Sequence, residues 1–291
     1  MASMRDIKRR KGSIQSTQQI TKAMKLVSTV KLQHAKSGAE KTKPYSDCMY
    51  ETIAQVLKKA GNIDHKYLKP GESDKVAIIV ITSNKGLAGG YNSNIIKMVN
   101  GSGIDPSKAV VYAIGRKGKE ALARKGYEIA NDYCEVINAP LFSDACKIGK
   151  DVLEGFVNNE FGEIYIAYTQ FKNTVSHIPT MRKLLPVQIE EQVKEDKDDK
   201  PTIDDLTLMN FEPDADEALD MIIPNYINSL IYGGLIESVA SENGARMQAM
   251  DSATSNAEEM ISDLSLKYNR ARQASITQEL TEIVAGASAI N

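Results

Sequence analysis

The longest stretch without a strong helix breaker lies at the C-terminal end and limits what the chain can fold into. After Pro224, only Gly233, Gly234 and Gly244 interrupt a helix-forming composition before Gly286. About 60 helical residues would extend roughly 90 Å, whereas a compact domain of about 110 residues has a radius of gyration near 13 Å. The sequence therefore predicts a helical rod that projects from a smaller globular domain.

A second helical stretch covers the N-terminal residues from Met4 to Ala60, with Gly12, Gly38 and Pro44 as its only interruptions. In both terminal stretches, small and apolar residues form a thin stripe at helical spacing. Such narrow stripes favour a two-helix coiled coil over a globular core, so we expect the two segments to pair in antiparallel orientation. The expected seam residues are Ile7, Ile14, Thr21, Met24, Ser28 and Ala35, with Ile236, Ala240, Met247, Met250, Thr254, Ala257, Ile261, Leu264, Tyr268 and Ala271.

Between Lys75 and Val187 the pattern changes to short apolar runs separated by helical stretches and glycine turns. The run 76–82 is apolar on both faces, as expected for a central parallel strand covered by helices. The same signature predicts strands at 109–114 and 164–168, helices at 92–99, 117–125 and 144–157, and an edge strand, interrupted by prolines, within 174–187. Alternating strands and helices indicate an α/β domain.

The predicted organisation has four segments. An N-terminal coiled-coil helix covers 1–60, an α/β domain 75–189, an acidic surface loop 190–215 and a long C-terminal coiled-coil helix 216–291. The net charge of -2 conceals a basic first segment, in which 13 Lys and Arg face 4 Asp and Glu. Such a surface suits nucleic acid or an acidic protein partner. Because no aromatic residues interleave with the basic side chains, the nucleic-acid signal is weak.

The sequence offers no residue set with the spacing of a known catalytic or cofactor site. The loop Ser83–Asn94 follows a buried strand, where phosphate-binding loops lie, but its glycines fit neither dinucleotide-binding nor P-loop spacing. The three histidines lie in different segments, and Cys48, Cys134 and Cys146 have no metal-ligand spacing. We therefore expect no cofactor, no metal site and free thiols, in a protein that is not itself an enzyme. We also expect no signal peptide and no membrane span.

The stretch Leu266–Ala285 has helical composition but spreads polar and apolar side chains around its whole circumference. Such a distribution suits a helix that a partner contacts on several sides. The only arginines of the C-terminal helix are Arg246, Arg270 and Arg272, which offer bidentate donors to partner carboxylates. We expect the function to reside in this stretch.

Three motifs carry a family resemblance: QITKAM at 19–24, GLAGGYN at 86–92 and ARQASITQELTEI at 271–283. The sequence resembles the γ subunits of F-type ATP synthases along essentially its whole length. The resemblance implies an antiparallel coiled coil that turns inside a hexamer of alternating α and β subunits. It also implies a Rossmann-like domain outside the hexamer, beside the ε subunit and the membrane c-ring. The role implied is that of a central rotor shaft, which couples ion flow through the ring to conformational cycling of the catalytic β subunits.

The resemblance also assigns contacts to particular residues. Met24 matches the position that faces an acidic segment of β. Arg246, Arg272 and Gln273 match a polar group that binds a β loop, and Thr277 and Glu279 adjoin this group. The foot on the ring side is matched by Glu212, Pro213 and Asp214. The implied location is peripheral, on the cytoplasmic face of the cell membrane, without direct insertion and without nucleic acid. The coupling ion, proton or sodium, is a property of the ring.

Two other readings of the residues stay open at this stage. One is a small α/β nucleotide-binding enzyme whose helical arms dimerise, and the other is a basic coiled-coil tether that binds nucleic acid. Micromolar ATP binding would favour the first, and salt-sensitive DNA binding the second.

Overall fold

The computed structural model describes residues 4–60, 65–187 and 215–290. The chain divides into two compact units. The coiled-coil unit comprises Met1–Val30 and Arg246–Asn291, and the α/β unit comprises Lys31–Ala245. The segments predicted as the acidic loop, 190–215, and the foot, Glu212, Pro213 and Asp214, lie outside the described residues except for Ala215. The predicted division into four segments stays a prediction.

Two long helices, α1 (Met4–Ala60) and α6 (Ala215–Ile290), each run through both units without a break. Each contains an interior proline, which removes a backbone hydrogen bond and costs roughly 3 kcal/mol. Around Pro224, however, α6 buries Leu219 and Ile223 completely, and each such side chain contributes about 1.5–3 kcal/mol. Packing therefore outweighs the proline, and α6 begins ahead of Pro224 at Ala215.

The coiled-coil unit is an antiparallel pair, as its seam predicts. Three contacts set the register. Thr21 and Thr254 share a hydrogen bond of 2.8 Å, the Gln18 amide donates to Glu258 over 3.0 Å, and Lys25 pairs with Asp251 at 2.5 Å. The seam positions are more buried than their neighbours, with Thr21, Ser28, Met250, Thr254 and Ala257 buried and Ile7, Ile14, Ile261, Leu264 and Tyr268 half-buried.

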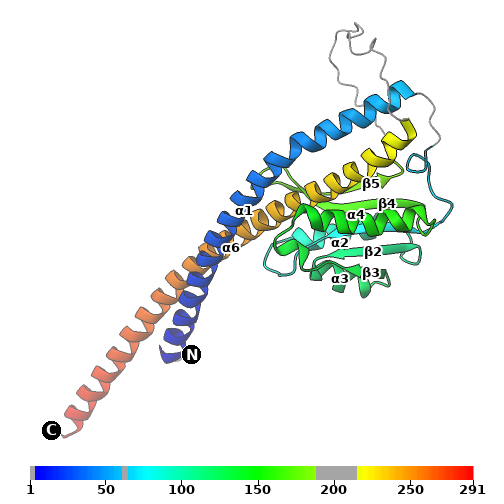
Figure 1. Ribbon diagram of the computed structural model, residues 1–291. Coiled ribbons are helices and arrows are strands. Elements are labelled where there is room, and N and C mark those ends of the chain that lie inside the picture. Colours follow the sequence, from blue (N-terminus) through cyan, green and yellow to red (C-terminus); the bar gives the residue numbers. More distant parts are fainter. Residues whose placement is uncertain (1–3, 61–64, 188–214, 291) are drawn as a thin grey trace, which may run out of the picture. The chain divides into compact units, whose positions relative to one another are not determined.

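The α/β unit contains one five-stranded sheet in the order β3-β2-β1-β4-β5. Its first four strands are parallel, and β5 pairs with β4 in antiparallel orientation. The strands are β1 Val76–Ile81, β2 Ala109–Ile114, β3 Glu128–Asp132, β4 Glu163–Phe171 and β5 His177–Leu185. The connecting helices are α2 Tyr91–Asn100, α3 Arg116–Ala123 and α4 Phe142–Val157, with a 3-10 turn at Val136–Asn138. Figure 1 shows these helices against the sheet.

Alternate residues of the central strands face two separate cores. Ile78 and Val80 of β1 pack in the core formed with α2 and α3. Ile79 and Ile81 point the other way, into the core formed with α4, the α6 turns from Leu219 to Leu235 and the end of α1. Both faces of the sheet are therefore covered, which explains the continuous apolar run that predicted β1.

Strand β3 was not predicted from the sequence. It is an edge strand whose five residues are exposed or half-buried, so it has neither an apolar run nor a clear alternation. The edge strand expected within 174–187 is present as β5. The helix expected at 117–125 ends earlier, at Ala123, ahead of Gly126, whose φ of 87° is left-handed. None of the described helices is long and apolar enough to cross a membrane.

Adjacent glycines in α6 provide a test of how closely this helix packs on the sheet. A Cβ added to Gly234 would lie 2.9 Å from Ile166 Cδ1, whereas one added to Gly233 meets nothing within 4 Å. We predict that Gly233→Ala raises the free energy of unfolding by about 0.5–1 kcal/mol. Gly234→Ala should lower it by about 1–3 kcal/mol through overpacking. Urea unfolding of the full chain measures both; equal effects of the two changes would contradict the packing.

Candidate partner-binding surface

The last turns of α6 lie beyond the reach of α1. Counting outward from the Thr21–Thr254 pair, Met4 at the start of α1 falls opposite Ala271. Up to Ala271 the seam positions of α6 are at least half-buried, and from Ile276 onward every described side chain is exposed. Figure 1 shows the red end of α6 continuing past the dark blue start of α1. This end of the coiled-coil unit is therefore open on all sides.

Polar side chains on these turns keep most of their hydrogen-bonding capacity unused. Arg272, Gln273 and Glu279 are exposed, and their side chains form no hydrogen bond or ion pair with any other described residue. Thr277 is also exposed, but its hydroxyl donates to the Gln273 carbonyl oxygen over 2.9 Å. A guanidinium, an amide and a carboxylate are thus presented within about two helical turns. Together they can pair with carboxylates, amides and cations of a partner.

Apolar side chains accompany these polar groups. Ile276, Leu280 and Ile283 are exposed and lie on one face of α6, because their spacings of four and three residues match the helical repeat. Val284 extends this stripe and is also exposed. Exposed apolar stripes with a polar surround are typical of binding surfaces. We call Arg272–Val284 the α6 tip surface.

The other residues assigned to partner contact lie elsewhere on the coiled-coil unit. Met24 and Arg246 are half-buried, and Arg246 already has a polar interaction within the chain. Along α6, Arg246 is about 39 Å from Arg272. One short partner loop cannot reach both arginines. The structure therefore brings Arg272, Gln273, Thr277 and Glu279 together and separates Arg246 and Met24 from them, so these would be distinct contacts.

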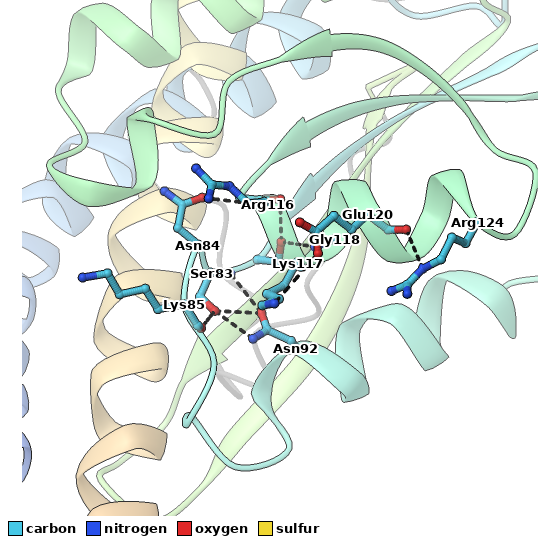
Figure 2. Close-up of polar contacts among 11 residues, drawn as sticks. Ser83, Asn84, Lys85, Asn92, Arg116, Lys117, Gly118, Glu120 and Arg124 are labelled. Carbon is cyan, nitrogen blue, oxygen red and sulfur yellow. Dashed lines mark hydrogen bonds and ion pairs between the residues drawn. The ribbon is translucent and has the colours of Figure 1, made fainter. Parts of the chain in front are cut away.

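The loop after β1 uses its polar atoms to cap α3 rather than leaving them for a ligand (Figure 2). The first three backbone amides of α3 all have acceptors in this loop. Arg116 N donates to Asn84 Oδ1 over 2.9 Å, Lys117 N to the Ser83 carbonyl over 3.1 Å, and Gly118 N to Thr82 Oγ1 over 2.9 Å. Phosphate groups bind helix N-termini through such amides when they are free. The capping residues Thr82, Ser83 and Asn84 were missed by the sequence reasoning, although a polar triplet directly after a buried strand was the available signal.

The rest of the loop supports the same conclusion. Asn92 Oδ1 accepts from the Ser83 amide over 2.9 Å, and Asn92 Nδ2 donates to the Ser83 hydroxyl over 2.7 Å. The Lys85 side chain points away from the first turn of α3 in Figure 2. The geometry therefore offers a phosphate neither free amides of α3 nor a converging lysine from Lys85.

A surface cavity of about 660 Å3 beside α3 holds charged groups and the Cys134 thiol. Burial, reinforced by the neighbouring Asp132 carboxylate, raises the pKa of Cys134 to about 11, so the thiol is protonated at neutral pH. Hydrogen bonds from Cys134 and Lys119 lower the pKa of Asp132 to about 2. The Asp132 carboxylate therefore favours the protonated thiol over the nucleophilic thiolate. All three cysteines are free.

The fold and the α6 tip surface define a coiled-coil protein that carries a Rossmann-like sheet. A family model described as ATP synthase matches residues 3–290. The chain is 70% identical over 291 residues to the ATP synthase gamma chain of Lachnoclostridium phytofermentans, with both chains fully covered. It is 44% identical over 299 residues to the sodium ion specific ATP synthase gamma chain of Acetobacterium woodii, with 99% of each chain covered. Among solved structures, a chain of the Euglena gracilis mitochondrial ATP synthase, in a complex with OSCP, F1 and c-ring, has a TM-score of 0.65 at 19% identity, covering 99% of this chain and 94% of that one.

The chain therefore belongs to the ATP synthase family, and within it to the gamma chains. It is a rotor subunit of the rotary F-type enzyme. The family resemblance read from the three sequence motifs is confirmed along the whole chain.

The Thr21–Thr254 hydrogen bond tests the coil register. Each single change to valine should lower the free energy of unfolding by about 1 kcal/mol, because it leaves the other buried hydroxyl without its cross-helix partner. The double change removes both hydroxyls and should cost less than the sum, with a coupling of about 0.5–1.5 kcal/mol. Urea unfolding of the four proteins measures this coupling. As control, Thr17 is exposed and donates only to the Ser13 carbonyl, so Thr17→Val and Thr254→Val should be additive.

Titration of the full chain with ATP tests the capped loop. Because the α3 amides are already bonded, we predict no saturable binding at micromolar ATP, measured by calorimetry or by fluorescent nucleotide. Lys85→Ala should leave the titration unchanged. Saturable micromolar binding that Lys85→Ala or Lys117→Ala weakens would contradict the assignment of this loop to packing.

Proposed function

We propose that this chain is the non-catalytic central shaft of its ATP synthase, coupling ion flow through a membrane ring to conformational cycling of the catalytic β subunits. The observation that carries the proposal is the α6 tip surface. Arg272, Gln273 and Glu279 are exposed and left without partners among the described residues. Exposed polar groups without partners, on turns that also carry an exposed apolar stripe, suit a helix that meets different subunits as it turns.

The proposed partners are the α and β subunits around the coil, and the ε subunit and c-ring beside the α/β unit. The shaft can bias a β site only if it contacts the open and closed states of that site differently. The α6 tip surface has the asymmetry that this requires, since its apolar stripe at Ile276, Leu280 and Ile283 occupies one face of the helix. Each angle of the shaft would therefore present a different side of α6 to a given β subunit.

The chemistry of ATP is assigned to β because this chain has no suitable site among its described residues. Side chains of the loop after β1 accept from the first amides of α3, and the pKa of the Cys134 thiol is raised. As the peripheral subunit between the catalytic head and the ring, the chain would lie on the cytoplasmic face of the cell membrane. The foot contact at Glu212, Pro213 and Asp214 is part of the same proposal.

The distance between Arg246 and Arg272 makes this proposal testable in the assembled complex. Removing charge-assisted contacts costs about 1.5–3 kcal/mol each, so we predict that Arg272→Ala with Gln273→Ala reduces ATP hydrolysis or co-purification with α and β by about tenfold or more. Because Arg246 would form a separate contact, Arg246→Ala should have its own effect, and the effects should add.

The matched control is Lys267→Ala, which removes an exposed cation of the same helix to which no partner contact is assigned. The Lys267→Ala complex should assemble and hydrolyse ATP about as well as the complex without substitutions. Full activity of the Arg272→Ala/Gln273→Ala complex would remove the proposed contact with β. Strong non-additivity between Arg246 and Arg272 would contradict two separate contacts.

A further inference from the structure

One edge of β4 continues past the strand that it pairs with. The register of β1 and β4 runs from Val76–Glu163 to Val80–Ala167, and β1 ends at Ile81. Strand β4 continues to Phe171. The backbone amides and carbonyls of Thr169 and Phe171 point away from β5, to the side where β1 has already ended. The backbone of Thr169 and Phe171 therefore needs hydrogen-bond partners that no strand supplies.

Helix α6 supplies these partners from three residues. The Ser241 hydroxyl donates to the Thr169 carbonyl oxygen over 3.1 Å, the Thr169 amide donates to Ser238 Oγ over 3.4 Å, and the Phe171 amide donates to Glu237 Oε2 over 3.3 Å. Ser238 and Ser241 are completely buried. A helical serine often bonds the carbonyl four residues earlier in its own helix. Ser241 instead bonds a strand. We call Thr169, Phe171, Glu237, Ser238 and Ser241 the β4–α6 lock.

The neighbouring positions of α6 allow the close approach that the lock requires. Gly234 and Gly244 lie on the same face of the helix as Ser238 and Ser241, at spacings of three and four residues. A Cβ on Gly244 would lie 2.6 Å from His177 Nε2, at the start of β5. The backbone of α6 is thus held directly against the end of the sheet over these turns.

Hydrogen bonds restrain the rotation of α6 about its own axis more than apolar packing does. The α6 turns from Leu219 to Leu235 bury apolar side chains against the sheet, and burial of apolar area is non-directional. The three bonds of the lock depend on direction, since hydrogen bonds weaken steeply as they bend. Turning α6 about its own axis by one residue step would break all three. We propose that the β4–α6 lock sets the rotational position of α6 against the sheet, and that torque passes between the α/β unit and α6 at this point.

The inference rests on the proposed function, because torque exists only if the chain is a rotor shaft. In that role the ring would drive the α/β unit while the β subunits load the far end of α6, which is continuous from Ala215 to Ile290. A shaft gripped only by apolar contacts could slip under load. Glu237, Ser238 and Ser241 are therefore positioning residues, whose loss uncouples rotation rather than catalysis.

The test uses the complete ATP synthase in sealed vesicles. Hydrolysis of ATP builds an ion gradient that slows the coupled enzyme, and an ionophore relieves this back-pressure. We expect Ser238→Ala/Ser241→Ala and Glu237→Ala complexes to hydrolyse ATP at the unchanged rate with ionophore. Without ionophore, α6 of these variants should slip against the sheet. The ratio of the ATP hydrolysis rates with and without ionophore should therefore fall towards one. Each lost hydrogen bond should favour slipped states by roughly fivefold.

Two variants separate the lock from a general effect on stability. Glu237→Gln keeps an acceptor oxygen for the Phe171 amide and should restore stimulation. Asn225→Ala removes a hydrogen bond that α6 makes only with its own Met221 carbonyl, and should behave as the unchanged complex. If the buried serine variants do not assemble, the half-buried Glu237 pair decides the question.

Unchanged stimulation in Glu237→Ala and in the serine variants would overturn the inference, even if their thermal unfolding temperature falls. Absence of stimulation in the unchanged complex would be a different failure. That result would contradict the proposed shaft function itself, and the lock would fall with it.

Discussion

The structure depends on one helix, α6, whose surroundings change twice along its 76 residues. From Leu219 to Leu235 it packs in the core with the sheet and α4, and from Met250 to Ala271 its seam positions, buried or half-buried, pair with α1. Past Ile276 it is exposed. A free helix shorter than about 12–15 residues is marginal in water because its first turn is costly to nucleate. The exposed end needs no new nucleus, since it extends turns that packing already holds. The buried parts of α6 therefore make its open end possible.

Hydrogen-bond capacity divides the molecule into regions with different roles. The loop after β1 has the position of a phosphate-binding loop, but its oxygens accept from the amides of α3. At the α6 tip surface, Arg272 and Gln273 remain without partners among the described residues. A satisfied polar group contributes to packing and specificity within the chain. An unsatisfied one on an exposed surface is available to another molecule. The loop after β1 thus contributes to packing, and the polar groups available to a partner lie on α6.

Periodicity accounts for most of what the sequence predicted. The run at β1 and the seam positions such as Thr21 and Thr254 repeat at intervals that strands and helices impose. Strand β3 lacked this signal because only one side of an edge strand is paired, and its side chains remain exposed. The family resemblance, in turn, groups residues by role and does not show how far apart they lie along a helix. Arg246 and Arg272 were assigned to one polar group, yet one helix separates them by about 39 Å.

The β4–α6 lock lay beyond sequence reasoning for a related reason. Ser238 and Ser241 are small residues on a helix stripe, and a small-residue stripe predicts only close packing. Both serines bond the backbone of Thr169, and Glu237 bonds the Phe171 amide. These backbone groups have no neighbouring strand on the β1 side because β1 is shorter than β4. That need arises from the lengths and register of two strands, which are set by the whole sheet. Apolar seams hold a helix against a sheet, and directional hydrogen bonds add a further restraint on its angle. For a helix proposed to transmit rotation, the edge of β4 beyond the end of β1 therefore supplies the directional contacts between the sheet and α6.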